Sequence, residues 1–380
     1  MELKCPYFKE CGGCNYLDIS YEEELKNKGQ MVKKLFDSIG YKKDIEIIEN
    51  DKPYFYRNKV IVAFKLSKTG KVTSGIYEEG TKKIVPVNNC LIQAEAINEL
   101  LLQLHEVLNK NKIKPFGYGG VLKHALIRYG FKTKELLLTL VTSEELFPGR
   151  NNIVKDLTTK NKNIKTIIQN IQSRNTPVVL GDKERILYGT GFIYDYLDNL
   201  KFKISSKSFY QINPVQTVKL YQEAINFADI QNGDIVLDTY SGIGTIGLFS
   251  AKNAKKVYLV ENNKDAHKDS IGNAKLNNVG NAEAILADST KFLVDLAETK
   301  DKIDVLFLDP PRDGSTKEFI EAVSKLKIKK VVYISCNPKT QIRDLKWFMD
   351  NGYIIKNVKA FDQFSRTLHV ESIALITRKN

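Results

Sequence analysis

The spacing of apolar residues changes near residue 200, and the first half of the chain predicts an α+β domain. Residues 20–36 carry a helical spacing, and Ser20 before them is a suitable N-cap. Short apolar runs separated by glycines over residues 54–92 indicate strands, and residues 124–142 predict a β-hairpin. We therefore expect helices and mainly antiparallel strands to mix in this half.

From residue 201 onward, apolar strands alternate with amphipathic helices. The first of these helices should begin at Asn213 and Pro214, since Asn suits an N-cap and Pro the first helical position. Regular alternation of this kind predicts a mostly parallel sheet with helices on both faces. Residues 201–380 are thus expected to form a Rossmann-like α/β domain.

Composition and charge narrow the class of protein. An apolar content of 42% without an apolar stretch long enough to cross a bilayer predicts a globular protein, and the N-terminus lacks the apolar core of a signal peptide. We expect a cytoplasmic protein. The net charge is +13; residues 61–130 hold ten Lys and Arg against five Asp and Glu, and residues 301–380 hold fifteen against ten. Two basic regions favour a nucleic acid partner over general solubility.

A glycine-rich turn opens the predicted α/β domain. Gly242, Gly244 and Gly247 form G-x-G-x-x-G between a strand and a helix, and Glu261 ends the next strand, where it can accept hydrogen bonds from a ribose. The pattern predicts a nucleoside cofactor without separating NAD from S-adenosylmethionine. An acidic residue before the loop, Asp238, and a second acidic site after the third strand, Asp288, favour the latter.

Two polar residues follow apolar strands further along. Asp309 lies in FLDPPR and Cys336 in YISCNP. Because ligands of open α/β sheets bind outside the carboxyl ends of the strands, both should border the cofactor pocket. A lone cysteine at a strand end is about as often a packing residue, but Asn337 and Pro338 should break the strand and expose this thiol.

Three of the five cysteines fall within ten residues. Cys5, Cys11 and Cys14 have the spacing C-x5-C-x2-C, and Cys90 is the one other cysteine outside YISCNP. Disulfides are rare in the cytosol, so the cluster predicts metal binding. Four thiolates suit either a 4Fe–4S cluster or tetrahedral zinc.

Taken together, these motifs resemble the RNA uracil-5-methyltransferases, which make 5-methyluridine in ribosomal or transfer RNA. The resemblance spans nearly the whole chain: CPYFKECGGC at the start, the glycine loop, DPPR, SCNP, and HVES at residues 369–372. It implies that Cys336 is the nucleophile that adds to carbon 6 of uracil, and that Glu371 is the base that removes the proton from carbon 5. None of the four histidines matches a base in these motifs.

The resemblance also implies the ligands of both cofactors. For S-adenosylmethionine it indicates Gln211, Tyr240, Glu261 and Asp309, to which we add Asp288. For the metal it favours a 4Fe–4S cluster on Cys5, Cys11, Cys14 and Cys90. The expected partner is RNA, with 23S ribosomal RNA preferred and transfer RNA the alternative, bound by a monomer without the extra β-barrel of some members.

The expected organisation follows from these assignments. An iron–sulfur region over residues 1–95 overlaps a central α+β RNA-binding domain over residues 54–200, and the methyltransferase domain covers residues 201–380. The helix within residues 17–48 is expected to pack on that last domain. An NAD-dependent oxidoreductase with an iron–sulfur centre is the alternative from another class, but it leaves SCNP and DPPR unexplained. A non-catalytic RNA-binding or redox-sensing protein would leave Cys336 and Glu371 as coincidences.

Overall fold

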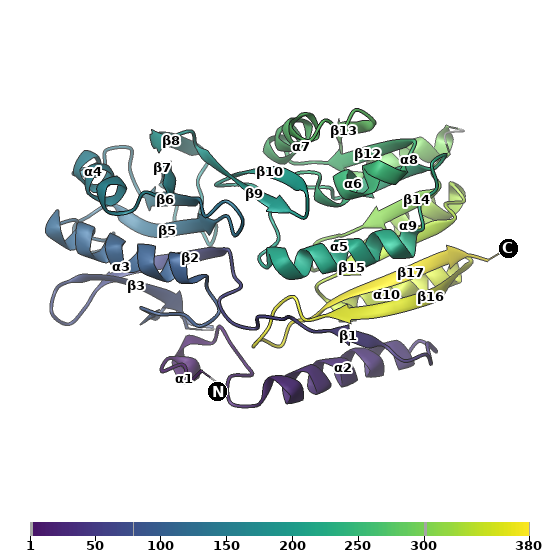
Figure 1. Cartoon of the computed structure of the whole chain (residues 1–380), viewed down its shortest axis with the longest axis horizontal. Coiled ribbons are helices and arrows are strands. Elements are labelled where there is room, and N and C mark those ends of the chain that lie inside the picture. Colours follow the sequence, from purple (N-terminus) through teal and green to yellow (C-terminus); the bar gives the residue numbers. More distant parts are fainter. Residues whose placement is uncertain (1–2, 79, 300–301, 380) are drawn as a thin grey trace.

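The computed structural model describes residues 3–78, 80–299 and 302–379, which build two large sheets side by side (Figure 1). The N-terminal half supplies a seven-stranded sheet in the order β4-β3-β2-β5-β6-β7-β8. Its strands are antiparallel except that β6 and β7 run parallel. The strands are β2 (Lys59–Leu66), β3 (Val72–Tyr77), β4 (Ile84–Pro86), β5 (Leu122–Tyr129), β6 (Leu136–Thr142), β7 (Ile164–Ile171) and β8 (Lys183–Gly189).

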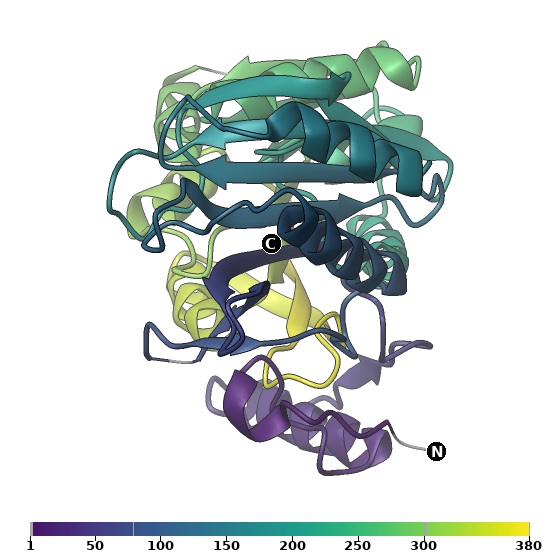
Figure 2. The same ribbon diagram turned by 90° about the vertical axis from the view of Figure 1, so that its left-hand side faces the viewer.

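Two helices cover one face of this sheet, as Figure 2 shows. They are α3 (Glu95–Lys110) and α4 (Arg150–Lys160), and their apolar side chains join those of β2, β5 and β6 in one core. A two-stranded ribbon of β9 (Phe192–Leu197) and β10 (Leu200–Ser205) then leads to the second sheet. The predicted hairpin is confirmed, since β5 and β6 pair antiparallel from Tyr129 and Leu136 onward.

The second sheet has eight strands in the order β1-β16-β17-β15-β14-β11-β12-β13. The five adjacent strands β15, β14, β11, β12 and β13 run parallel to one another. Strand β17 is antiparallel to both of its neighbours, and β1 is parallel to β16. The strands are β1 (Glu46–Ile48), β11 (Ile235–Thr239), β12 (Lys256–Glu261), β13 (Ala282–Leu286), β14 (Val305–Leu308), β15 (Lys330–Ser335), β16 (Tyr353–Phe361) and β17 (Glu371–Arg378). The predicted Rossmann-like α/β fold is confirmed.

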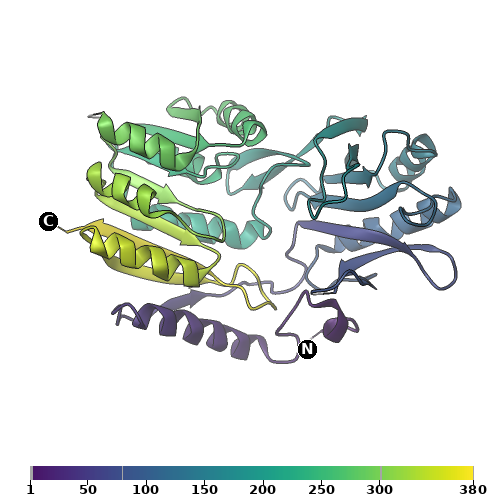
Figure 3. The ribbon, with the colours of Figure 1, turned by 180° about the vertical axis from the view of Figure 1, so that it is seen from behind.

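Helices cover both faces of the eight-stranded sheet. One face is covered by α5 (Pro214–Ala228), α6 (Thr245–Ser250), extended by a 3-10 turn at Ala251–Asn253, and α7 (Lys264–Leu276). The opposite face, seen in Figure 3, is covered by α8 (Ser289–Glu298), α9 (Lys317–Lys325), α10 (Pro338–Asp350) and the N-terminal helix α2 (Tyr21–Asp37).

The N-terminal segment contributes to both halves of the molecule. Ser20 caps α2 by accepting a hydrogen bond from the backbone N–H of Glu23, as its sequence position predicted. Val32 and Phe36 of this helix are fully buried in the core beneath the eight-stranded sheet. The short helix α1 (Phe8–Cys11) instead lies beside the seven-stranded sheet (Figure 1). One segment therefore spans the two sheets.

Candidate active site and thiol cavity

The carboxyl edge of the eight-stranded sheet brings the predicted catalytic residues together. Cys336 directly follows β15, and Glu371 is the first residue of the antiparallel strand β17. Ser335 and Ser372 are register partners, so Cys336 and Glu371 adjoin the same step of the ladder. Asp309 directly follows β14, the other neighbour of β15. A thiol and two carboxyls thus meet at one edge of the sheet.

Burial and mutual repulsion govern the protonation of these three groups. Burial, then the negative charges of Glu371 and Asp309, raises the pKa of the Cys336 thiol to about 11. Burial raises the pKa of Asp309 to about 7. Glu371 is 2% exposed, and burial together with Asp309 holds its pKa well above the usual range. The buried site therefore disfavours negative charge on all three groups.

Arg312 is a member of the site that the sequence reasoning did not identify. Its guanidinium lowers the pKa of Cys336 by charge and by a hydrogen bond, and it lies 3.3 Å from His369 Nε2. Its backbone carbonyl accepts hydrogen bonds from Asn337 Nδ2 at 3.1 Å and Thr340 Oγ1 at 3.0 Å. The available signal was its place in DPPR, three residues after Asp309.

The glycine loop has the tight geometry that a nucleoside site requires. Gly242 and Gly244 have φ values of 56° and 84°, in the left-handed region that favours glycine. A side chain at Gly247 would overlap Leu259, and the Gly247 N–H donates to Asp238 Oδ2 at 2.8 Å. Through this bond, Asp238 steadies the turn. Glu261 accepts from the Gly242 N–H at 2.9 Å, which places it against the loop.

Unpartnered polar atoms point to a ligand beside this loop. Asp238 Oδ1 and the Ser241 hydroxyl are buried and have no hydrogen-bond partner among the described residues. Tyr240 lies between them in sequence and adopts a left-handed φ of 58°. These residues therefore fit an adenosyl ligand, whose hydroxyl and amino groups would form hydrogen bonds with the unpartnered atoms.

The two remaining predicted cofactor residues differ in their surroundings. Gln211 is 7% exposed, and its backbone carbonyl accepts a hydrogen bond from Asn58 of the seven-stranded half at 2.9 Å. Asp288 is exposed and caps α8, because its Oδ1 accepts the Lys291 N–H at 3.0 Å. A cap explains Asp288 without a ligand, so its part in cofactor binding stays a prediction.

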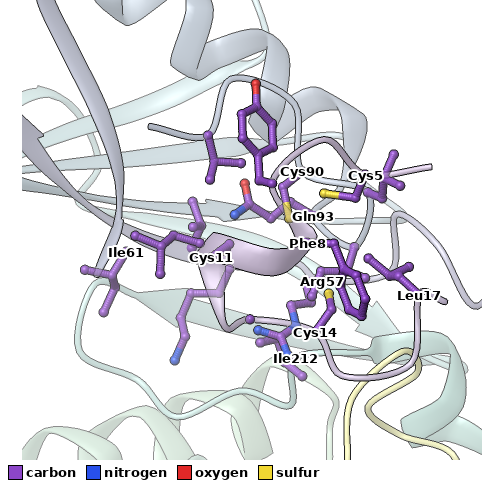
Figure 4. A pocket seen from close by; sticks show the side chains of 18 residues that line it. Cys5, Phe8, Cys11, Cys14, Leu17, Arg57, Ile61, Cys90, Gln93 and Ile212 are labelled. Carbon is purple, nitrogen blue, oxygen red and sulfur yellow. The ribbon is translucent and has the colours of Figure 1, made fainter. Parts of the chain in front are cut away.

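The four predicted metal ligands line one cavity of about 260 Å³, next to α1 and the start of β2. Figure 4 labels Cys5, Cys11, Cys14 and Cys90 around it, together with Arg57. Burial, then the neighbouring Cys90, raises the pKa of Cys14 to about 12, while the charge of Arg57 opposes this rise. No group of three or more His, Cys, Asp or Glu among the described residues is placed to hold a metal ion directly.

Membrane association through a spanning helix finds no support in the part of the chain that the structure describes. None of its helices is both long enough and apolar enough to cross a bilayer.

Comparisons with known proteins agree with this architecture. The profile of the tRNA (uracil-5-)-methyltransferase family matches residues 20–379. An uncharacterised RNA methyltransferase of Clostridium acetobutylicum is 39% identical to this chain, over 99% of this chain and 84% of the relative. One of Bacillus cereus is 36% identical, over 99% of this chain and 83% of the relative. The crystal structure of Pyrococcus abyssi tRNA (uracil-54, C5)-methyltransferase in complex with S-adenosyl-L-homocysteine superposes with a TM-score of 0.79 at 27% identity, covering 97% of this chain and 86% of that one.

Proposed function

This chain belongs to the tRNA (uracil-5-)-methyltransferase family, and from this premise we propose that it methylates a uridine at carbon 5 through a covalent adduct on Cys336. It is an S-adenosylmethionine-dependent RNA methyltransferase. The observation that carries the reaction course is the meeting of Cys336, Glu371 and Arg312 at one edge of the sheet. Carbon 5 of uracil is a weak nucleophile, so a reaction there benefits from such an arrangement.

Cys336 begins the reaction. Its thiolate sulfur bonds to carbon 6, and the electron pair of the carbon 5–carbon 6 double bond moves toward oxygen 4, which gives an enolate. Carbon 5 is now nucleophilic and takes the methyl group. S-adenosylmethionine, when bound, would supply that group as an electrophilic methyl on a sulfonium, whose sulfur keeps the electron pair of the broken sulfur–methyl bond. Arg312 stabilises the thiolate, because its positive charge lowers the pKa of Cys336.

Glu371 ends the reaction. Carbon 5 of the adduct carries both the new methyl group and its original hydrogen. The Glu371 carboxylate takes this proton, the electrons of the broken carbon–hydrogen bond restore the ring double bond, and the carbon–sulfur bond breaks to return the thiolate. The raised pKa of Glu371 makes its carboxylate a stronger base, which suits removal of a proton from carbon.

The residues that would hold S-adenosylmethionine surround the glycine loop. Glu261 would accept hydrogen bonds from the ribose hydroxyls, while Asp309, Tyr240 and Gln211 would line the side of the cofactor pocket that faces Cys336. Asp288 is a candidate near the adenine. There its carboxylate would contact the ligand and cap α8 at the same time.

The experiment that tests the reaction course separates its two halves. Cys336→Ala should give neither adduct nor product, whereas Glu371→Gln should methylate the RNA and retain it as a slow band on a denaturing gel. Glu283→Gln, which changes an exposed carboxylate on β13, is the matched control and should turn over normally. Methylation by the Cys336→Ala protein, or normal turnover by Glu371→Gln, would overturn the assignment.

For the substrate, we propose a uridine of 23S ribosomal RNA, since the thiol motif resembles that of the iron–sulfur-containing branch. Transfer RNA is the second candidate, favoured by the likeness to the Pyrococcus abyssi enzyme, which is named for a tRNA uridine. Mass spectrometry of both RNA classes from a strain lacking the gene decides between them, because the true substrate loses one 5-methyluridine. A strain that loses none would contradict both.

We also propose that the thiol cavity holds a 4Fe–4S cluster. Four thiols that line one cavity suit either a 4Fe–4S cluster or a tetrahedral zinc ion. The resemblance of the cysteine spacing to that of the iron–sulfur-containing members of the family favours the cluster.

Metal analysis tests the cluster directly. Protein purified without air should contain about four iron and four sulfide per chain. Cys11→Ala should lose the metal and lower the melting temperature, since metal binding stabilises the fold around it. Cys336→Ala removes the thiol outside the cavity and should keep the iron. Stoichiometric zinc without sulfide would rule out the cluster.

A further inference from the structure

The loop between β16 and β17, residues 362–370, ends at the candidate base Glu371 and is held by buried polar contacts. Asp362 and Ser365 are fully buried, and Arg366 is 1% exposed. The contacts reach residues 15–56, more than 300 positions earlier in the chain. The placement of Glu371 therefore depends on the N-terminal segment as well as on its own sheet.

Arg366 makes most of these contacts. Its guanidinium donates to the carbonyls of Tyr16 at 3.1 Å and Ile19 at 3.2 Å, and to the Tyr54 hydroxyl at 2.6 Å. Its backbone N–H donates to Glu24 Oε1 at 2.6 Å. It adopts a left-handed φ of 67°, a conformation costly for any residue other than glycine. The contacts hold the loop in this strained form.

A buried ion cluster fixes the start of the same loop. Lys28 of α2 is 1% exposed and donates to Asp362 at 2.6 Å, to Glu24 at 2.8 Å and to the Phe364 carbonyl at 3.2 Å. The Tyr21 hydroxyl donates to the second oxygen of Asp362 at 2.6 Å. Because desolvation offsets much of the attraction in buried ion pairs, such a cluster contributes more clearly to a defined geometry than to stability.

The same loop is joined to the thiol cavity through two residues. The Arg366 carbonyl accepts the N–H groups of Asn15 at 2.9 Å and Tyr16 at 3.3 Å, and Asn15 Oδ1 accepts the Leu368 N–H at 3.1 Å. Asn15 directly follows Cys14, which lines the cavity. An unbroken chain of contacts thus runs from Cys14 through Arg366 to the segment that enters Glu371.

We propose that Arg366 is a positioning residue for Glu371, and that it transmits the order of the thiol-bearing segment to the proton-removal step. The inference rests on the proposed role of Glu371. Misplacement of a reacting group by about 1 Å can cost on the order of 100-fold in rate. Loosening the loop should therefore slow release of the adduct and leave its formation, which depends on Cys336, largely unchanged.

Variants of the contacts, rather than of the catalytic groups, test the positioning role. Tyr54→Phe removes one hydrogen bond from Arg366, and Arg366→Lys keeps the charge but shortens the reach to its acceptors. Tyr353→Phe is the control, since it removes a buried tyrosine hydroxyl that donates to the Val323 and Ile328 carbonyls, away from the loop. A thermal melt shows whether each variant folds; if Arg366→Lys does not, Tyr54→Phe carries the test.

Two measurements follow the expected effect. Amide hydrogen exchange without RNA should become faster at residues 362–370 in both variants and remain unchanged in the control. In single turnover, release of methylated RNA should slow roughly tenfold while methyl transfer stays within about twofold. Unchanged exchange in this loop, or equal slowing of both steps, would overturn the positioning role.

A thiol variant tests the transmission. Cys90→Ser alters the cavity from the seven-stranded half and keeps the sequence of residues 14–16, and it should also speed exchange at residues 362–370. Unchanged exchange there would overturn the transmission. Hydrogen exchange does not depend on the chemistry of Glu371, so it tests the positioning role independently of the proposed function. The proposed function would instead be contradicted if Glu371→Gln accumulated no adduct.

Discussion

At the scale of single residues, the proposed nucleophile Cys336 lies in surroundings that oppose its thiolate form. Burial and two nearby carboxyls raise the pKa of Cys336 to about 11, and among its main influences the charge of Arg312 is the one that opposes this rise. Burial raises the pKa of Asp309 to about 7, so this carboxyl is partly protonated near neutral pH, which relieves part of the repulsion. Arg312 is thus the main built-in support for the thiolate.

The raised pKa of Cys336 predicts a steep pH dependence of its reactivity. Below a pKa of about 11 the thiolate fraction grows about tenfold for each pH unit, so alkylation of Cys336 should accelerate accordingly between about pH 7 and pH 9. Arg312→Gln removes a stabilising charge, raises the pKa further and should slow alkylation at each pH. Peptide mass spectrometry after iodoacetamide treatment measures the rate.

A remote arginine provides the control for this experiment. Arg174 is exposed and pairs with Asp182, so Arg174→Gln should leave the profile unchanged. A rate that is flat across this pH range, or equal slowing by both variants, would contradict the assigned environment of Cys336.

At the scale of elements, one antiparallel strand decides how the site is assembled. The parallel strands β14 and β15 present Asp309 and Cys336 at their carboxyl ends. Because β17 runs in the opposite direction, its first residue, Glu371, reaches the same edge. The N-terminal cap of α10, Asn337, then joins this edge to Arg312.

The turn from β11 into α6 predicts a sharp response to one added methyl group. In Gly247→Ala the new Cβ would overlap Leu259 and crowd Asp238, which should cost about 1–3 kcal/mol of stability and weaken S-adenosylmethionine binding. Thermal melting and calorimetry measure the two effects.

The matched control is a glycine in the same domain with free space around it. Gly272 lies exposed within α7 and has nothing within 4 Å of an added Cβ, so Gly272→Ala should stabilise by about 0.5–1 kcal/mol. Wild-type stability and cofactor affinity in Gly247→Ala would contradict the close approach of the loop to Leu259.

At the scale of the whole molecule, the two halves contact each other beside Gln211, a residue of the proposed cofactor site. Asn58 of the seven-stranded half bonds to the backbone of Gln211 and Ile212, just before α5 of the eight-stranded half. The thiol cavity is lined by residues of the N-terminal segment, of β2 and of the segment after β4, and by Ile212. An RNA bound at the active site can therefore contact both halves, in accord with the net charge of +13.

Charge-driven RNA binding predicts a strong dependence on salt. If about six phosphates are neutralised, affinity should fall roughly 1000-fold between 50 and 200 mM salt. Lys207 is exposed and lies four residues before Gln211, so Lys207→Gln should lower the slope of log affinity against log salt by about one. Filter binding over a salt series measures this.

Lys302 is the control for this slope. It pairs with Asp304 at the amino end of β14, the opposite edge of the sheet from the site, and Lys302→Gln should leave the slope unchanged. An affinity that hardly varies with salt would show that the basic residues do not form the RNA surface.

Features that depend on nearby residues could be predicted from the amino-acid sequence alone. The cap of α2 at Ser20, the start of α5 at Asn213 and Pro214, and the glycine turn each follow from local backbone preferences, so they could be predicted. The alternation after residue 201 predicted the α/β layers for the same reason. The adjoining positions of Cys336 and Glu371 were inferred from family resemblance, because nothing local indicates that β17 runs antiparallel.

The contacts between distant segments became apparent only in the folded chain. Three contacts join positions that are far apart in the chain or that carry no periodic signal. They are the pairing of β1 with β16, the approach of Arg312 to Cys336, and the hydrogen bonds from Arg366 to residues 16–54. Asp288 caps α8 through a local contact, and its part in cofactor binding stays a prediction. Local preferences are set by a few neighbouring dihedral angles, whereas these contacts arise from the burial of whole faces and the pairing of buried polar groups.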